Sequence, residues 1–402
     1  MKQCLSDIRI LELGQVLAAP YAGMVLGDFG AEVIKVESPG GGDSARRTPP
    51  HFYKGESIYF MALNRNKKSV VLDLTRTAGR RVFYDLVKAS DVVLDNLRPG
   101  VSDKLKVNHE VLRKYNPGII SCSINGYGSD TPERSKPSFD LMVQARGGGM
   151  SLTGEPGGPP LRMGVSISDH AAGLYAVIGV LSALHARKQT GIGQKIEVPL
   201  LSTMISMLSY EAAFHLYSGE VPDPVGSGHR SLIPYNAVRT RDGHIVVDAH
   251  LPRFWSALCK ALGIEHLEND PRFAVLEVRN TNREELLRIL DETFSGKTSR
   301  EWLEILEANG IPCAPINDLK AALEDPTTRA LNMVVDIKHK GVDLNFRATG
   351  NPVRMSECET KYSSPPLLGE HTEEVLKNLL GYSDTKMEHL MQQKAILRAE
   401  VG

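Results

Sequence analysis

The sequence predicts an α/β protein with a large doubly wound, Rossmann-like domain and a smaller α+β domain. Three observations support this prediction. Short apolar strands alternate with helices up to about residue 125, which is typical of a parallel sheet with helices on its faces. The pattern changes near residue 225, where a hairpin and a run of helices begin. A chain of 402 residues also exceeds the size of one ordinary hydrophobic core.

The first unit of the large domain is a strand, a helix and a second strand. They are predicted at 9–13, 21–29 and 31–37, and Gly30 closes the helix. A crossover this short between two apolar strands indicates parallel pairing. The alternation continues with strands at 69–74, 92–94 and 119–124 and helices at 77–89, 105–115 and 139–145.

The small domain is predicted over residues 226–329. A β-hairpin at 236–249 turns at Asp242-Gly243, a dipeptide that favours the tight turn between two strands. Three helices follow, at 252–262, 281–294 and 298–308. The last two begin with the capping-box patterns Thr281-x-x-Glu284 and Thr298-x-x-Glu301.

The end of the chain is expected to rejoin the large domain. From about Leu331 the sequence contains short strands and then a helix at 372–380. The large domain is therefore predicted to comprise residues 1–225 together with 330–402.

The composition limits the class of partner. A net charge of −1 provides no basic field for nucleic acid, so an anionic ligand requires a local basic site. The five cysteines are scattered without metal-ligand spacing, which favours reduced thiols and no metal site. Ordered sequence begins near Leu5 without room for a targeting segment, and the apolar run 174–184 is too short to span a bilayer. We expect a cytoplasmic protein that binds neither nucleic acid nor membrane.

Asp169 stands where an alternating segment gives way to a long apolar run that ends near Arg187. If a helix begins at His170, Asp169 is its N-cap, which is usually a structural role. The same position favours an ionised carboxylate, as a carboxylate nucleophile requires. The sequence contains no G-x-S-x-G or H-E-x-x-H motif. Asp169 is therefore the candidate catalytic residue.

Basic residues gather at two loop ends of the predicted sheet. Asn66-Lys67-Lys68 leads into one strand, and Asn96-Leu97-Arg98 directly follows another. Ligands bind at one edge of such a sheet, and converging cations suit a polyphosphate. Arg46, Lys104 and Lys136 are candidates for additional charge. Each cluster taken alone is also compatible with solvated surface charge.

A dinucleotide cofactor is the alternative ligand for such a sheet. Glu37 ends the second strand, as the ribose-binding acid of dinucleotide folds does. However, the loop at 14–20 lacks the G-x-G-x-x-G pattern that approaches a pyrophosphate, so nicotinamide binding is disfavoured.

A set of motifs occurs in collinear order from about Leu5 to Tyr382. They are Ile10-Leu11-Glu12-Leu13, the segment 26–37, Gly42-Asp43-x-x-Arg46, the segment 64–69, Asn96-Leu97-Arg98-Pro99-Gly100, Thr190-Gly191-x-Gly193-Gln194 and Pro366-x-Leu368-Gly369-x-His371-Thr372. Together they resemble the family III CoA-transferases, which include formyl-CoA transferase, carnitine CoA-transferase and the α-methylacyl-CoA racemases. Asp169 falls on the catalytic aspartate of that family.

The resemblance implies a CoA-transferase reaction. Asp169 attacks the thioester of a donor acyl-CoA, the resulting aspartyl anhydride becomes an aspartyl-CoA thioester, and an acceptor carboxylate then takes the CoA. CoA or acyl-CoA is then a substrate, and no permanently bound cofactor is expected. The family commonly forms two interlocked rings, each a protomer threaded through the other. A homodimer of this kind, or a heteromer with a homologous silent subunit, is implied.

The CoA site carries over residue by residue from the resemblance. The implied or added CoA-binding residues are Val16, Arg46, Asn66, Lys67, Lys68, Asn96, Leu97, Arg98, Lys104 and Lys136. Ser38 replaces an arginine that formyl-CoA transferase uses on CoA, which leaves more of the phosphate charge to Lys67, Lys68 and Arg98. Leu17 replaces a glutamine beside the anhydride, so oxalate is not the expected acceptor.

Phe139 distinguishes the transferase branch from the racemase branch. Racemases pair the aspartate with a histidine, and Phe139 occupies that place although its ring cannot move a proton. His170 adjoins Asp169, but neighbours at a helix start point apart. The transferase reading is therefore favoured, and an α-methylacyl-CoA racemase is the alternative.

Within the transferases, the segment 226–235 resembles the succinyl-CoA-dependent enzymes that act on dicarboxylates. This resemblance implies that Gly228, His229 and Arg230 face the acyl group, together with Leu17 and Phe139. His229 and Arg230 suit the free carboxylate of a succinyl group. Succinyl-CoA is the expected donor, while benzylsuccinate-type acids, mesaconate, malate and glutarate all stay open as acceptors.

Overall fold

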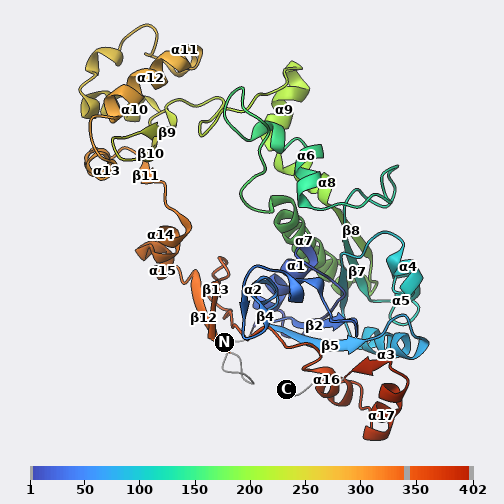
Figure 1. Ribbon diagram of the computed structural model, residues 1–402. Coiled ribbons are helices and arrows are strands. Elements are labelled where there is room, and N and C mark those ends of the chain that lie inside the picture. The colour runs from blue at the N-terminus through green and yellow to red at the C-terminus, as the bar shows by residue number, and fades with distance from the viewer. Residues whose placement is uncertain (1–2, 339–344, 398–402) are drawn as a thin grey trace. The chain divides into compact units, whose positions relative to one another are not determined.

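The computed structural model describes residues 3–338 and 345–397. The chain forms two compact units, drawn in Figure 1. The large unit comprises Met1–Gly149, Met163–Ala213 and Thr327–Gly402, and the small unit comprises Met150–Arg162 and Phe214–Pro326. Residues 150–162 and 214–225, which the sequence assigned to the large domain, thus group with the small unit.

The large unit is built on a seven-stranded sheet in the order β14-β5-β2-β1-β6-β7-β8. Its strands are β1 (Arg9–Glu12), β2 (Glu32–Glu37), β5 (Lys67–Leu72), β6 (Val92–Asp95), β7 (Ile120–Asn125), β8 (Lys195–Pro199) and β14 (Ile396–Leu397). All neighbours pair in parallel except β14, which runs antiparallel to β5. The chain adds strands on one side of β1 and then on the other, so the order reverses between β1 and β6. The predicted α/β class with a large parallel sheet is confirmed.

Helices cover both faces of this sheet, as Figure 1 shows. On one face lie α1 (Ala18–Asp28) and α7 (Ile167–Thr190), and their alanines pack on Ile10, Leu94 and Ile120. On the other lie α3 (Thr77–Lys88), α16 (Thr372–Asn378) and α17 (Asp384–Gln392). Gly173 allows the close approach of α7 to α1, because a Cβ there would lie 2.9 Å from the carbonyl oxygen of Ala18.

The remaining elements of the large unit are short. The strands are β3 (Phe52–Tyr53), β4 (Glu56–Ser57), β12 (Val334–Lys338) and β13 (Asn345–Thr349). The helices are α2 (Ile58–Leu63), α4 (Val101–Leu105), α5 (His109–Leu112), α6 (Asp140–Arg146), α8 (Leu200–Met207), α9 (Ser209–Ser218) and α15 (Pro326–Ala330), of which α9 and α15 cross the unit boundaries.

A disulfide joins Cys4 to Cys358, across 354 positions of sequence. The expectation of reduced thiols throughout is therefore wrong for this pair, whereas Cys122, Cys259 and Cys313 are free. The two sulfur atoms meet because the C-terminal part of the large unit packs beside its N-terminal part. Spacing along the sequence carries no sign of that approach.

The small unit is an α+β structure with its own core. Its antiparallel sheet has the order β11-β10-β9, formed by β9 (Tyr235–Arg239), β10 (His244–Asp248) and β11 (Cys313–Pro315). Its helices are α10 (Pro252–Leu262), α11 (Leu276–Thr281), α12 (Arg283–Phe294), α13 (Ser299–Ala308) and α14 (Leu319–Glu324). The capping box at Thr298 is present. The one predicted at Thr281 is wrong, because Thr281 ends α11 and Asn282 precedes α12.

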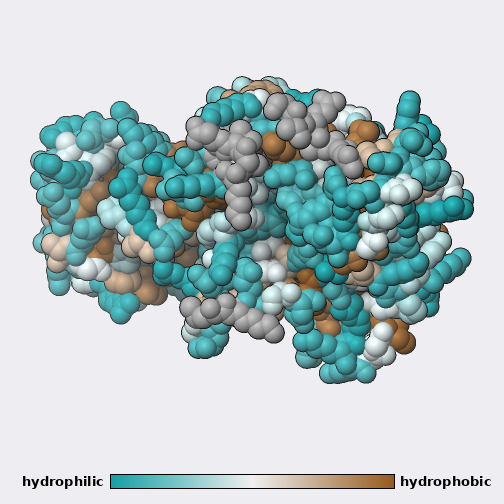
Figure 2. Space-filling model, turned by 90° about the horizontal axis from the view of Figure 1, so that it is seen from below, coloured by the Kyte–Doolittle hydropathy of each residue, from teal (hydrophilic) through white to brown (hydrophobic). Residues whose placement is uncertain are grey.

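The helix α7 is long and apolar enough to cross a membrane by length and composition alone. Half of its most apolar window is buried inside the structure, however, and Ala172, Ala176 and Val180 belong to the core of the large unit. We therefore interpret α7 as a core helix. The face of the molecule in Figure 2 is mostly hydrophilic, with apolar side chains in separate patches.

Candidate active site

A cavity of about 540 Å³ lies in the large unit at the carboxyl ends of β1, β6 and β7. This is where the strand order reverses, the usual position of a ligand site in an open parallel sheet. The cavity brings together eight residues predicted from the sequence, namely Val16, Leu17, Asn96, Leu97, Arg98, Lys136, Phe139 and Asp169. Sequence reasoning missed other lining residues, among them Ser44, Asn125 and Ser138.

Asp169 is the carboxylate that lines this cavity. Because α7 begins at Ile167 with Ser166 as its N-cap, Asp169 is the third helical residue and not the cap expected from the sequence. Burial, together with the nearby charge of Asp140, raises the pKa of Asp169 to about 7. The helix start was expected to stabilise the ionised form, but burial and the charge of Asp140 outweigh that effect. Near neutral pH, both protonation states of Asp169 are therefore populated.

The loop between β1 and α1 forms one wall of the cavity. Val16 adopts a left-handed backbone conformation with φ 64°, which is costly for a β-branched residue and is often found at functional sites. Its N–H donates to Asp43 Oδ1 at 3.0 Å. Gln15 N–H donates to Asn96 Oδ1, and Asn96 Nδ2 donates back to the Gln15 carbonyl, both at 2.8 Å. Asp43 and Asn96 thus hold the loop in its strained conformation.

Beneath that loop lies a network of buried charges. Lys35 Nζ contacts Glu12 at 2.8 Å and Asp43 at 2.9 Å, and donates to the Gly14 carbonyl at 2.7 Å. Lys67 Nζ contacts the other oxygen of Glu12 at 2.8 Å. Burial lowers the pKa of Lys67 to about 8, against the opposing pull of the Glu12 carboxylate. The network fixes the loop base from inside the protein.

Five of the predicted CoA-binding residues lie outside the cavity, which differs from the sequence expectation. Arg46 forms a bidentate pair with Glu37, at 2.7 and 2.8 Å, and stacks on the Phe60 ring. Lys67 is buried in the network above. Both cations look available in the sequence, but the buried carboxylates of Glu37 and Glu12 are their partners in the structure.

Two more of the five, Asn66 and Lys68, are also engaged within the protein. Asn66 Nδ2 donates to Asp28 Oδ1 at 2.8 Å. Lys68 pairs with Glu32 at 2.9 Å and Glu374 at 3.0 Å. Lys104, the fifth, is exposed on α4 and does not line the cavity.

The two cations and the aromatic side chain that line the cavity differ in their exposure and in their interactions with other protein groups. Arg98 is exposed, and no ion pair of its guanidinium occurs in the described part of the chain. Lys136 pairs with Glu133 at 2.6 Å. Phe139, the N-cap residue of α6, is 56% exposed and presents its ring to the cavity. Arg98 is therefore the lining cation most available to an anionic ligand.

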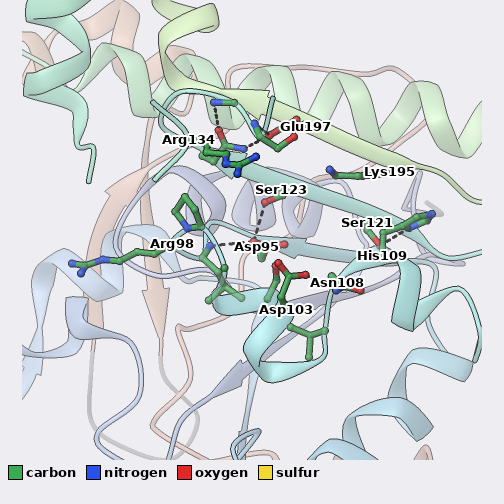
Figure 3. Close-up of a pocket in the computed structure, with 18 of the residues that line it drawn as sticks. Asp95, Arg98, Asp103, Asn108, His109, Ser121, Ser123, Arg134, Lys195 and Glu197 are labelled. Atoms are coloured by element: carbon green, nitrogen blue, oxygen red, sulfur yellow. Dashed lines mark hydrogen bonds between the residues drawn. The ribbon is translucent and has the colours of Figure 1, made fainter. Parts of the chain in front are cut away.

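A second cavity, of about 530 Å³, shares Leu97, Arg98, Pro99 and Asn125 with the first. Figure 3 shows its floor, where Ser123 Oγ donates to Asp95 Oδ1 at 3.1 Å. Burial raises the pKa of Asp95 to about 6. The loop that begins at Asn96 therefore lines both cavities. In the sequence, Asp95 is marked only by its position directly before the motif Asn96-Leu97-Arg98-Pro99-Gly100.

The remaining predicted residues, Gly228, His229 and Arg230, belong to the small unit. There Arg230 Nη2 donates to the Asp223 carbonyl at 2.7 Å, and His229 Nδ1 accepts from Ser231 N–H at 3.1 Å. The His229 ring makes an edge contact with Tyr235. Among residues 3–338 and 345–397, no group of three or more His, Cys, Asp or Glu side chains is arranged to hold a metal ion.

Comparison with known proteins identifies the family. The pattern of CoA-transferase family III matches residues 5–372. Succinyl-CoA:glutarate CoA-transferase of Mus musculus is 37% identical over 388 residues, covering 96% of this chain and 89% of that protein. Succinate–glutarate CoA-transferase of Agrobacterium fabrum is 35% identical, covering 94% and 96%.

A solved structure agrees with this result. The crystal structure of a CAIB/BAIF family protein from Brucella suis matches with a TM-score of 0.84 and 35% identity, over 94% of this chain and all of that one. The chain therefore belongs to CoA-transferase family III and is a CoA-transferase that uses CoA thioesters as substrates.

Proposed function

We propose that the enzyme moves CoA from succinyl-CoA to a dicarboxylic acid through covalent intermediates on Asp169. The observation that carries this proposal is a carboxylate in a cavity at the sheet edge, beside an available cation, Arg98. The relatives named for succinyl-CoA and glutarate support the class of donor and acceptor.

The proposed reaction conserves acyl-transfer potential at each step. An Asp169 oxygen attacks the thioester carbonyl, the C–S bond breaks, and CoA departs as a thiolate, leaving a mixed anhydride. The thiolate attacks the aspartyl carbonyl, which gives an aspartyl-CoA thioester and releases succinate. The acceptor carboxylate attacks that thioester, and the thiolate then cleaves the new anhydride on the acceptor side. Asp169 is regenerated, so no ATP is consumed.

The cavity supports this chemistry in two ways. Asp169 has a pKa near 7, so its ionised form is more basic than an ordinary aspartate and is still populated at neutral pH. Val16, Leu17 and Phe139 contribute apolar wall, which limits access of water to an anhydride. The same wall gives oxalate, a small and doubly charged acid, little to bind.

The CoA chain is proposed to lie along Val16, Asn96, Leu97, Arg98 and Lys136. Arg98 is the main phosphate contact in this arrangement, because its charge is not neutralised by a protein carboxylate in the described residues. Arg46, Asn66, Lys67 and Lys68 are proposed to act indirectly, by holding the loops beneath the site. Lys104 is proposed to add surface charge on α4. CoA is bound only as a substrate, without a resident cofactor.

The small unit is proposed to supply acyl specificity. His229 and Arg230 suit the free carboxylate of succinyl-CoA or of a dicarboxylic acceptor. Arg230→Ala should then weaken use of succinyl-CoA far more than binding of free CoA. Equal losses in both measurements would remove this assignment.

We also propose that two protomers interlock as rings, or that the chain pairs with a homologous silent subunit, and that the enzyme acts in the cytoplasm. The assembly is supported only by the resemblance of the sequence to the family. Sedimentation of the purified chain distinguishes the two forms, because a homodimer forms alone and a heteromer does not.

The decisive experiment is mass spectrometry after mixing the enzyme with succinyl-CoA and a panel of dicarboxylates. A CoA adduct on the peptide that contains Asp169 is expected, with CoA passed to one member of the panel. Asp169→Asn should form no adduct, while Asp130→Asn, a change of an exposed aspartate, should behave as the wild type. An adduct-free enzyme that exchanges the α-proton of an acyl-CoA with heavy water would overturn the proposal.

A further inference from the structure

A buried acid from α6 supports the segment that carries Asp169. Asp140, the first residue of α6, is 6% exposed. Its Oδ1 accepts the backbone N–H of Ser168 at 3.0 Å, one residue before Asp169. Its Oδ2 accepts from Gln144 Nε2 at 2.7 Å. The carboxylate is thus oriented by hydrogen bonds on both oxygens.

Gln144 extends the support toward the start of the same segment. Its side chain is fully buried, and its Oε1 accepts the N–H of Met163 at 2.9 Å. The segment 163–168 is therefore fixed at both ends by two side chains one turn apart on α6. Because α7 begins inside this segment, the pair sets where the first turn of α7 presents Asp169.

We propose that Asp140, anchored by Gln144, is a positioning residue for Asp169 and strengthens it as a nucleophile by placing a second negative charge beside it. This inference rests on the proposed covalent role of Asp169. It assigns Asp140 an electrostatic task in addition to its hydrogen bond. A bulk-exposed aspartate would be a weaker base and therefore a less reactive nucleophile.

Other charged or titratable groups lie near Asp169 or line the same cavity, and they are distinguishable from Asp140. They are Tyr59 on α2, Arg98 and Lys136 in the cavity wall, and His170 in the next position of α7. Burial, with the charges of Asp169, Asp43 and Asp140, raises the pKa of Tyr59 to about 12, so its phenol stays neutral. His170 is directed elsewhere, with Nδ1 on the Ser166 carbonyl at 2.8 Å and its ring against Tyr21. Besides burial, Asp140 is the charge that acts on the pKa of Asp169.

In Asp140→Asn the charge is lost while the amide oxygen can still accept from Ser168 N–H; the amide NH2 then faces the donor Gln144 Nε2, so that hydrogen bond is lost as well. Gln144→Ala is the matched control, since it removes the same hydrogen bond and leaves the charge. For each protein, the rate of adduct formation with succinyl-CoA is measured in single turnovers from pH 5 to 9. Carbon-13 NMR of labelled aspartate follows the titration of Asp169 without any need for activity, assigned by comparison with Asp169→Asn.

The wild-type rate should rise with pH around a midpoint near 7. In Asp140→Asn that midpoint should fall by about one pH unit, in the rate and in the NMR titration, and the plateau rate should fall about tenfold. In Gln144→Ala the rate should fall with an unchanged midpoint. An Asp140→Asn midpoint equal to that of the wild type would overturn the inference. Failure of the wild type to form any adduct would instead contradict the proposed function, and the NMR titration would still test Asp140.

Discussion

Asn96 and Gln15 exchange two hydrogen bonds, one in each direction, between the segments that follow β6 and β1. These are the two strands between which the strand order of the sheet reverses. The amide of Asn96 therefore closes the floor of the crevice and, with Asp43, holds Val16 in its left-handed conformation. A side chain predicted to touch CoA thus also determines the shape of one wall of the cavity.

Asn96→Asp should raise KM for succinyl-CoA about tenfold, because a carboxylate can accept from Gln15 N–H but repels the Gln15 carbonyl. The turnover number should change little, since Asp169 belongs to another element. Steady-state kinetics with succinyl-CoA measure both values. Asn309→Ala, which loses a hydrogen bond at the end of α13, is the control and should leave KM unchanged. A large loss of kcat with constant KM would contradict this account.

Arg98 and Lys67 should respond differently to substitution, although both were predicted to bind CoA. Arg98→Ala should raise KM for succinyl-CoA about tenfold or more with little loss of stability, as for an exposed phosphate contact. Lys67→Met should lower the free energy of unfolding by about 3 kcal/mol, because it removes a partner from the buried Glu12 carboxylate. Urea unfolding and kinetics separate the two effects. Equal stability losses in both variants would refute the distinction.

Asp169→Asn should stabilise the enzyme at alkaline pH. The pKa of Asp169 is raised to about 7 in the folded protein, from the 3.8 that is ordinary for an aspartate, so its ionisation lowers the free energy of unfolding, and this loss is complete above pH 7. The loss fades as pH falls from 7 toward 4, where both states are protonated. Urea unfolding should show a gain in stability of about 2 kcal/mol at pH 8 and a smaller gain at pH 5.5. The gain at pH 8 is less than the whole pKa shift would correspond to, because water in the cavity screens the charge. A gain that does not depend on pH would argue against a raised pKa.

The disulfide should be measurable by thiol counting. In the absence of reductant, unfolded protein should expose three thiols, those of Cys122, Cys259 and Cys313, and reduction should reveal two more. Reduction should lower the stability by about 2–4 kcal/mol, as for disulfides that close long loops. Cys4→Ser should abolish the response of the melting temperature to reductant. Five reactive thiols in protein isolated under non-reducing conditions would show that the bond does not form in the cell.

Much of the sheet could be predicted from the sequence because its central strands β1, β2, β5, β6 and β7 alternate with helices along the chain. Most of them also contain a short apolar stretch, such as Val33-Ile34 in β2 and Val70-Val71-Leu72 in β5. The two edge strands were missed, since β8 mixes charged and apolar residues and β14 has only two residues. An edge strand has a neighbouring strand on one side only and is less buried. Its sequence therefore shows the apolar pattern of a buried strand less clearly.

Residues of the candidate site could be predicted where their position next to a strand or helix end is enough to place them at the cavity. Asn96, Arg98 and Asp169 lie at the cavity because each directly follows or begins an element at the carboxyl edge of the sheet. Lys67 and Arg46 were assigned to the ligand because Glu12 and Glu37, their partners, are not marked as such by any local pattern. Asp140 was overlooked for the same reason, since its link to Ser168 spans 28 residues.

The bond between Cys4 and Cys358 also has a topological consequence. Every peptide bond between these residues, including those of the entire small unit, lies within one covalently closed circle. A single proteolytic cut inside the circle therefore opens the loop without dividing the molecule. If two protomers thread through each other as proposed, the closed circles are linked mechanically. Such a dimer would persist in non-reducing denaturant and separate only when the sulfur–sulfur bond or the backbone is cut.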